Sequence, residues 1–255
     1  NVYFYHSMEA YVKNYCEGNI GFLEFGNPAG NSLPSPLLKA FKAGLIALEK
    51  DSNVRVIIIQ SFGDRAFCGG ASLAEMKTLQ TIEEATAFFM GIADLINTLR
   101  SLSKFVIGRV HGKVVGGGVG LVAACDYVLA NRTAQIKLSE LSIGIGPYVI
   151  EPVVSRKIGG TAFAQLSLDA HQWKSATWAE DKGLYHALFE TQVELDLAVK
   201  TNAERFASYP EKAVKTLRKL HWKETEHWDK LLPKNAAITG ELALQEATQN
   251  ILKKL

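Results

Sequence analysis

Three consecutive glycines, Gly116 to Gly118, separate an apolar strand from an apolar helix within the stretch 111–126. Glycine has no side chain, so a ligand can approach the backbone closely at such a loop. The helix that follows begins with unpaired amides and the positive end of its dipole, and both favour negative charge. The stretch therefore predicts an anion-binding loop, and we expect it to hold an oxyanion that develops during a reaction.

The rest of the chain supplies strands and helices in alternation around this loop. Strands are expected at 10–16, 19–25, 54–60, 104–110, 126–131 and 135–138, with the first two joined as a hairpin. Helices are expected at 34–50, at 73–102 with a break near Thr81, and almost throughout from Val149 onward, the last one near 236–255. This order predicts an α/β fold with much parallel pairing, followed by an α-helical tail.

The same pattern sets the expected boundaries within the chain. A core domain is expected at 8–190 and a C-terminal helical segment at 191–255. The first residues, NVYFYHS, lack the charged start and apolar centre of a signal peptide. Residues 1–7 resemble the remnant of a cleavable tag, and we assign them no function.

Composition excludes several classes of function. The chain has 28 basic and 26 acidic residues, a net charge of +2, which predicts neither a nucleic-acid partner nor a membrane partner. Its apolar runs are too short to span a bilayer. Cys16, Cys68 and Cys125 form no CxxC pair, and no His or Cys cluster has metal-ligand spacing. We therefore expect a protein of a reducing compartment, the cytoplasm, with no metal site.

A second loop of small residues, Cys68-Gly69-Gly70, also lies between a buried strand and a helix. If the two glycine loops converge, one amide from each can bind the same oxyanion. The alternative is that these glycines only permit tight turns and close packing. Glu140 follows a strand and precedes another glycine-containing loop. An apolar setting would raise its pKa toward neutrality and suit it to acid–base catalysis, whereas a solvated Glu140 would only cap the next element.

A competing motif overlaps the glycine triplet. Gly118-Val119-Gly120-Leu121-Val122-Ala123 fits the G-x-G-x-x-G/A dinucleotide fingerprint, and Glu140 follows at the distance of a ribose-binding acid. Five residues, 111–115, separate the strand from the glycines, which is longer than the tight turn that the fingerprint needs.

Three other side chains near the glycine loops are expected to have structural roles. Asp126 is expected to cap the preceding helix or to form an ion pair, and Cys68 is expected to fill space. His111 is expected to pack at a strand end.

The loops taken together resemble the enoyl-CoA hydratase/isomerase family, the crotonase superfamily. The resemblance runs from about Asn31 to Phe189, in the right order and spacing. The motifs that carry it are Asn31-Ser32-Leu33, Arg65-Ala66-Phe67-Cys68-Gly69-Gly70-Ala71-Ser72, the stretch from His111 to Gly118, Ala124-Cys125-Asp126, Ser139-Glu140 with Ile143-Gly144, and 176–184.

This resemblance implies a fold, a ligand and a site. The fold is a spiral of ββα units with a C-terminal α-helical segment. The substrate is an acyl-CoA thioester, so coenzyme A belongs to the substrate and no separate cofactor is implied; the assembly is a homotrimer or hexamer. By position, Gly69 and Gly117 supply the oxyanion amides and Glu140 is a catalytic glutamate. The implied substrate-binding residues are Arg65, Ala66, Phe67, Cys68, Gly70, Gly116 and Tyr148.

Three departures from the family pattern bear on the chemistry. The family's second catalytic glutamate would fall on Gly120, Ser72 replaces an aspartate, and Tyr148 stands where a glycine is common. A single Glu140 suits the movement of a double bond, which needs one base, although hydration with one glutamate stays open. Tyr148 could narrow the acyl pocket or supply a hydroxyl. Two alternatives remain: a non-catalytic acyl-CoA-binding protein and a hydroxyacyl-CoA hydrolase, which would need an aspartate at the position of Tyr148.

Overall fold

A computed structural model describes residues 9–255, so the expected tag remnant at 1–7 lies outside the described residues. The strands are β1 (Tyr11–Glu17), β2 (Ile20–Gly26), β3 (Val56–Ser61), β4 (Ala66–Cys68), β5 (Phe105–Val110), β6 (Lys113–Val115), β7 (Tyr127–Asn131), β8 (Ile136–Lys137) and β9 (Ala187–Phe189). The helices up to the middle of the chain are α1 (Ser35–Lys50), α2 (Leu73–Met76), α3 (Ile82–Ser101), α4 (Gly117–Ala123) and the 3₁₀ helix η1 (Glu140–Ile143). Those that follow are α5 (Glu151–Ile158), α6 (Gly160–Leu168), α7 (Ala176–Asp181), α8 (Gln192–Ala207), α9 (Glu211–His221), α10 (Trp228–Ala243) and α11 (Glu246–Leu252).

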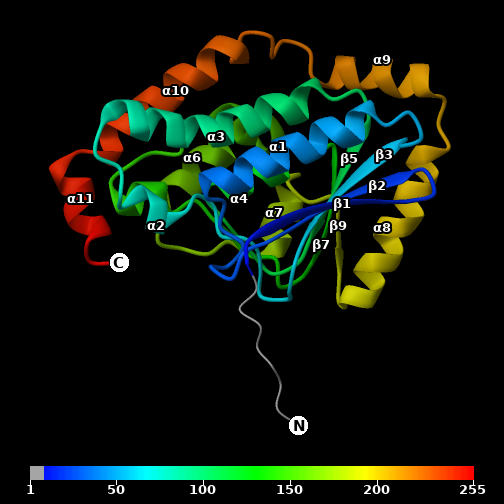
Figure 1. Cartoon of the computed structure of the whole chain (residues 1–255). Helices are drawn as coiled ribbons and strands as arrows, with labels where there is room; N and C mark the ends of the chain where they lie inside the picture. The colour runs from blue at the N-terminus through cyan, green and yellow to red at the C-terminus, as the bar shows by residue number, and fades with distance from the viewer. Residues whose placement is uncertain (1–8) are drawn as a thin grey trace.

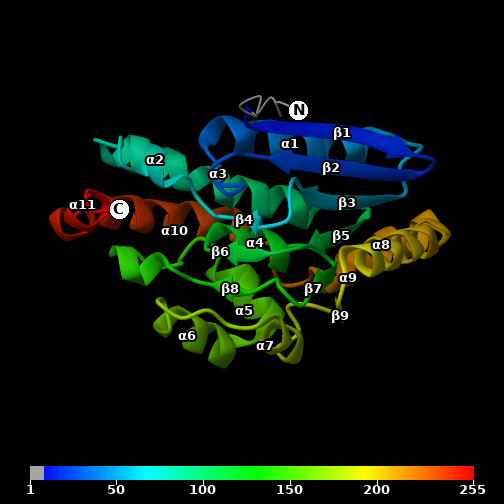
Figure 2. The ribbon, with the colours of Figure 1, turned by 90° about the horizontal axis from the view of Figure 1, so that it is seen from below.

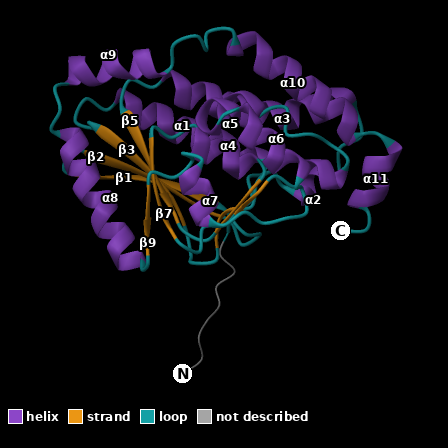
Figure 3. Ribbon diagram, turned by 180° about the vertical axis from the view of Figure 1, so that it is seen from behind, coloured by secondary structure: helices purple, strands orange, loops and turns teal. Residues whose placement is uncertain are grey.

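The main layer is a six-stranded sheet in the order β1-β2-β3-β5-β7-β9. The hairpin between β1 and β2 is antiparallel, as the turn at Gly18 predicted, and every other pairing is parallel. Helices α1 and α3 cover one face of this sheet and α8 covers the other (Figures 1 and 3). The strands β3 and β5 are apolar on both faces for this reason, which confirms the expected α/β fold.

A second, three-stranded parallel sheet of order β4-β6-β8 lies beside the first (Figure 2). Its short strands alternate with those of the large sheet along the chain, so that β3-β4, β5-β6 and β7-β8 form successive strand pairs. This is the spiral of ββ units that the resemblance implied. Because β4 and β6 have only three residues each, the sequence pattern had presented both as loop. The strand β9 was also missed, inside a stretch expected to be helical.

Local sequence signals explain where the helices begin and end. The five buried leucine and phenylalanine side chains of α1 recur at helical spacing and face the sheet. Thr81 caps α3 through a capping box with Glu84, at the break that was expected there. Two boundaries differ from expectation. The helix after the glycine triplet already begins at Gly117, and the expected last helix is divided into α10 and α11.

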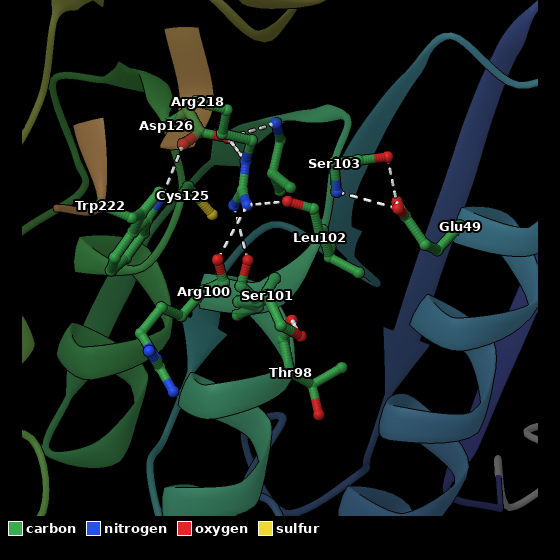
Figure 4. A network of polar contacts seen from close by, with 12 residues as sticks. Glu49, Thr98, Arg100, Ser101, Leu102, Ser103, Cys125, Asp126, Arg218 and Trp222 are labelled. Atoms are coloured by element: carbon green, nitrogen blue, oxygen red, sulfur yellow. Dashed lines mark hydrogen bonds and ion pairs between the residues drawn. The ribbon is translucent and has the colours of Figure 1, made fainter. Parts of the chain in front are cut away.

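The C-terminal helices are tied to the core by a buried ion pair. Arg218 of α9 donates from Nε to Oδ2 of Asp126, over 2.9 Å, and its side chain is 1% exposed (Figure 4). The rest of its guanidinium donates to the carbonyl oxygens of Leu99, Arg100 and Leu102 at the end of α3. Trp222 donates to the other carboxylate oxygen. The expected pairing role of Asp126 is confirmed.

No helix among residues 9–255 combines the length and apolarity needed to cross a membrane.

Candidate active site

An apolar cavity of about 670 Å³, partly open to solvent, lies where the two sheets and the helices α2, α3 and α10 meet. Among residues 9–255, Glu140 is the one ionisable residue in its lining. The other lining residues are apolar, glycine or hydroxyl-bearing: Gly69, Gly70, Ala71, Leu73, Met76, Phe89, Ile92, Val115, Gly116, Gly117, Ser139, Ile143, Ile145, Gly146, Pro147, Val149, Ile150 and Thr239. A carboxylate in such a lining has little water to stabilise its charge.

The two glycine loops converge at this cavity, as the family resemblance implied. A methyl group built on Gly70 would lie 3.3 Å from the amide nitrogen of Gly117 and 2.7 Å from the carbonyl oxygen of Val115. Gly117 is the first residue of α4, so its N–H has no acceptor within the helix. Gly70 has φ +82°, which a residue with a side chain rarely adopts. Glycine is therefore required here both by backbone conformation and by the close approach of the loops.

The amide of the first loop that lies near Gly117 is that of Ala71. A methyl group built on Gly117 would lie 3.8 Å from the amide nitrogen of Ala71. Leu33 donates to the carbonyl of Gly70 in a parallel bridge, which leaves the N–H of Ala71 on the opposite edge, toward Gly117. Gly69, which was predicted from the sequence to donate to the oxyanion, also lines the cavity. A methyl group built on Gly69 would lie 2.9 Å from the carbonyl oxygen of Gly30.

Glu140 begins the 3₁₀ helix, separated from the end of β8 by two residues, and its carboxylate lies against Gly116. A methyl group built on Gly116 would come within 2.9 Å of Oε1. Among residues 9–255 no group forms a hydrogen bond with the buried Oε2. Burial raises the pKa of Glu140 from 4.5 to about 7 because the charged form loses its hydration. The expected apolar setting of this glutamate is thus present, and near neutral pH the side chain can both take and give a proton.

The position of the missing second glutamate is filled by a neighbouring side chain. Gly120 lies one turn into α4 and is buried. A methyl group built on it would lie 2.8 Å from Cβ of Ile150 and closer still to Cγ2. Ile150 also lines the cavity. The backbone therefore has no room for a carboxylate at position 120 while Ile150 keeps its place.

The other predicted substrate-binding residues do not line the cavity with their side chains. Phe67 and Cys68 are fully buried in the core, and Ala66 is part of β4. Arg65 is exposed just before β4. The ring of Tyr148 packs over Gly146, with Cζ 2.7 Å from a methyl built there, and the residue is 41% exposed. Tyr148 is not among the residues that line the cavity.

The apolar wall of the cavity was not predicted from the sequence. Leu73 and Met76 of α2, Phe89 and Ile92 of α3, and Thr239 of α10 all line it. Thr239 lies more than a hundred residues from the glycine triplet, and no local pattern marks it. Phe89 and Ile92 lie in the stretch expected to be helical, but nothing in the sequence indicated that they border a cavity.

The packing around Gly118 and Gly120 bears on the dinucleotide-binding alternative. Gly118 packs on Cys68, whose Sγ lies 2.9 Å from a methyl built on Gly118, and Gly120 packs on Ile150. Both fingerprint positions therefore serve close packing and leave no space for a pyrophosphate. Cys68 is the buried filler that was expected, and burial raises the pKa of its thiol to about 12. Among residues 9–255 no three His, Cys, Asp or Glu side chains gather as metal ligands do.

Comparison with known proteins identifies the family of the chain. The model of the family described as enoyl-CoA hydratase/isomerase matches residues 16–253. A probable enoyl-CoA hydratase of Bacillus subtilis is 31% identical over 201 residues, 79% of this chain and 76% of that protein. A peroxisomal Delta(3,5)-Delta(2,4)-dienoyl-CoA isomerase of Arabidopsis thaliana is 27% identical over 216 residues, 78% of this chain and 76% of that protein. The crystal structure of an enoyl-CoA hydratase from Bacillus halodurans superposes with a TM-score of 0.90 at 20% identity, covering 96% of this chain and all of that one.

Proposed function

Because the chain belongs to the enoyl-CoA hydratase/isomerase family, we propose that it moves a double bond in an enoyl-CoA thioester with Glu140 as its one acid–base group. The observation that carries the proposal is the pairing of a single ionisable residue with an amide-lined apolar cavity. Membership of the family supports an acyl-CoA enzyme. The choice of reaction rests on the residues around Glu140.

The thioester carbonyl is proposed to lie between the two glycine loops. The N–H groups of Gly117 and Ala71 would donate to its oxygen, and their nearness to one another supports this pair. The sequence-based assignment of Gly69 stays a prediction for the same loop. As a proton leaves the carbon next to the carbonyl, negative charge develops on the oxygen, where fixed amides stabilise it. Loss of one such donor typically costs roughly 2.7–4 kcal/mol of transition-state stabilisation.

Glu140 would carry the proton between two carbons of the acyl chain. Its carboxylate accepts the proton as the carbon–hydrogen bond breaks and the enolate forms, and the resulting acid returns a proton to a different carbon. The double bond moves and no atom is gained or lost. A pKa of about 7 suits both halves of this transfer. Hydration by two carboxylates is disfavoured because Ile150 fills the space beside Gly120.

The experiment is a panel of enoyl-CoA thioesters with product identification by mass spectrometry. Migration of the double bond leaves the mass unchanged, hydration adds the mass of water, and hydrolysis releases free CoA. We expect migration, and we expect its loss in Glu140→Gln. Turnover that is undiminished in Glu140→Gln on every substrate would refute the role of Glu140. Tight binding of thioesters without any turnover would favour the non-catalytic alternative.

Further expectations follow from the family resemblance alone. The coenzyme A part of the substrate is proposed to run along the loop 65–68, where Arg65 is exposed. A homotrimer or hexamer in the cytoplasm is likewise proposed. Light scattering on the purified protein tests the assembly, and a monomer at micromolar concentration would contradict it.

A further inference from the structure

A pair of lysines converges on one tryptophan at the edge of the small sheet. Lys174 bridges Ile136 in an antiparallel arrangement, which sets Trp173 beside Lys137 of β8 (the sheet is seen in Figure 2). The Nζ atom of Lys137 lies 4.7 Å from the centre of the Trp173 ring, and that of Lys113 lies 4.9 Å from it. These are cation–π distances, so each ammonium group is held against the same ring.

Within the described part of the chain, neither ammonium group has an acidic partner. Among residues 9–255 no carboxylate lies within 4.0 Å of Lys113 or Lys137. The next lysine along the edge differs, because Lys174 pairs with Asp169 at 2.5 Å. Two like charges at one ring repel each other, and an anion bound beside the ring would offset that repulsion and accept a charge-assisted hydrogen bond from an ammonium group that reaches it.

The cluster lies next to the active-site cavity along β6 and β8. Side chains alternate along a strand, so Lys113 and Val115 of β6 point to the same face. Val115 lines the cavity and is paired in register with Lys137. The chain then runs from Lys137 directly to Ser139 and Glu140, which line the cavity too. A ligand that extends from the cavity over this face meets the two ammonium groups.

We propose that Lys113, Lys137 and Trp173 form a binding site for an anionic group of the thioester ligand, outside the reacting cavity. The inference rests on the proposed acyl-CoA function. The group is a carboxylate or a phosphate, and it has two sources: a free carboxylate at the far end of the acyl chain, or a phosphate of coenzyme A. The ammonium groups bind and orient it, and they take no part in proton transfer.

The test measures binding of ligands that cannot react. Saturated acyl-CoA thioesters of equal chain length, with and without a terminal carboxylate, are titrated into the protein and into Lys113→Met/Lys137→Met. The matching acyl-pantetheine thioesters, which lack the nucleotide phosphates, are titrated in parallel. Met is an unbranched side chain one heavy atom shorter than Lys, and it removes the charge. Lys42→Met is the control, since Lys42 pairs with Asp94 between α1 and α3.

Each outcome decides for or against the site. A loss of affinity of about ten- to a hundredfold, confined to carboxylated ligands, supports the acyl carboxylate. The same loss for every CoA thioester but for no neutral pantetheine thioester supports a phosphate. Unchanged affinities, or an equal loss that includes neutral pantetheine thioesters, overturn the proposal. Because binding is measured without turnover, the affinities can be interpreted even if the proposed double-bond migration does not occur.

Discussion

Ile150 occupies the space into which any side chain at Gly120 would have to project. A methyl group built on Gly120 would lie 2.8 Å from Cβ of Ile150, well inside van der Waals contact. The two residues come from α4 and from the segment just before α5, and both are buried beside the cavity. The absence of a second acid at position 120 is therefore matched by the packing around it. The cavity is shaped for one carboxylate, that of Glu140.

Gly120→Ala is expected to destabilise the protein by about 1–3 kcal/mol through overpacking against Ile150. Ile150→Gly opens a cavity and destabilises by itself, yet the double variant should lose less than the sum of the two single changes. Denaturant unfolding of all four proteins measures this coupling. Gly160→Ala is the control, because nothing lies within 4 Å of a methyl group there. Strictly additive losses would show that the two residues do not compete for space.

The rate of double-bond migration should rise with pH and level off above an apparent pKa of about 7. Burial raises the pKa of Glu140 to that value, and the base must be deprotonated to accept the first proton. A profile of kcat/KM against pH on the free enzyme reports this group. In Glu140→Gln the ascending limb should disappear along with most of the activity. A limb with its midpoint near 4.5 would contradict the burial of the carboxylate.

Glu140→Gln should also stabilise the protein, and more so at alkaline pH. The folded state holds the proton more tightly than the unfolded chain, so Glu140 costs no stability below about pH 4.5. The cost grows as pH rises and levels off above pH 7 at roughly 3 kcal/mol. Urea unfolding at pH 5 and pH 8 should give a larger gain at pH 8. The exposed Glu204→Gln controls for loss of a carboxylate. An equal gain at both pH values would refute the raised pKa.

Gly116→Ala should lower kcat by displacing Glu140. The added methyl would come within 2.9 Å of Oε1, and φ at Gly116 is +53°, so the change also strains the backbone. Gly18→Ala separates the two effects, since Gly18 has φ +59° and nothing within 4 Å of a methyl group. Both variants should lose about 1 kcal/mol or more of stability. Only Gly116→Ala should lose activity. Equal activity in the two variants would mean that Glu140 tolerates the displacement.

Arg218→Met should destabilise the protein by about 3–5 kcal/mol, because it leaves the buried carboxylate of Asp126 without its ionic partner. Asp126→Asn should be costly for the converse reason. The double variant should lose less than the sum, which a double-mutant cycle by denaturant unfolding measures. Arg55→Met is the control. Arg55 pairs with Glu211, which is 77% exposed, and such pairs contribute about 0–1 kcal/mol. A loss in Arg218→Met as small as in Arg55→Met would contradict the anchoring role.

The sequence by itself determined the alternation of strands and helices, the capped start of α3 and the presence of two glycine loops. These features follow from local rules. Apolar spacing selects a helix or a strand, Thr81 with Glu84 forms a cap, and a glycine triplet before a helix leaves free amides. The family resemblance added the convergence of the loops and the role of Glu140. The three-residue strands β4, β6 and β9 were missed because segments of that length carry too little pattern to separate from a loop.

Only the tertiary structure decided which atoms meet. The amide of Ala71 lies near Gly117, because the pairing of Leu33 with this loop fixes which way the N–H of Ala71 points. Thr239 reaches the cavity because α10 packs on α3, a contact between segments far apart in sequence. Ile150 fills the place beside Gly120 for the same kind of reason. Distances between chain-remote atoms depend on how whole elements pack, and no local pattern encodes them.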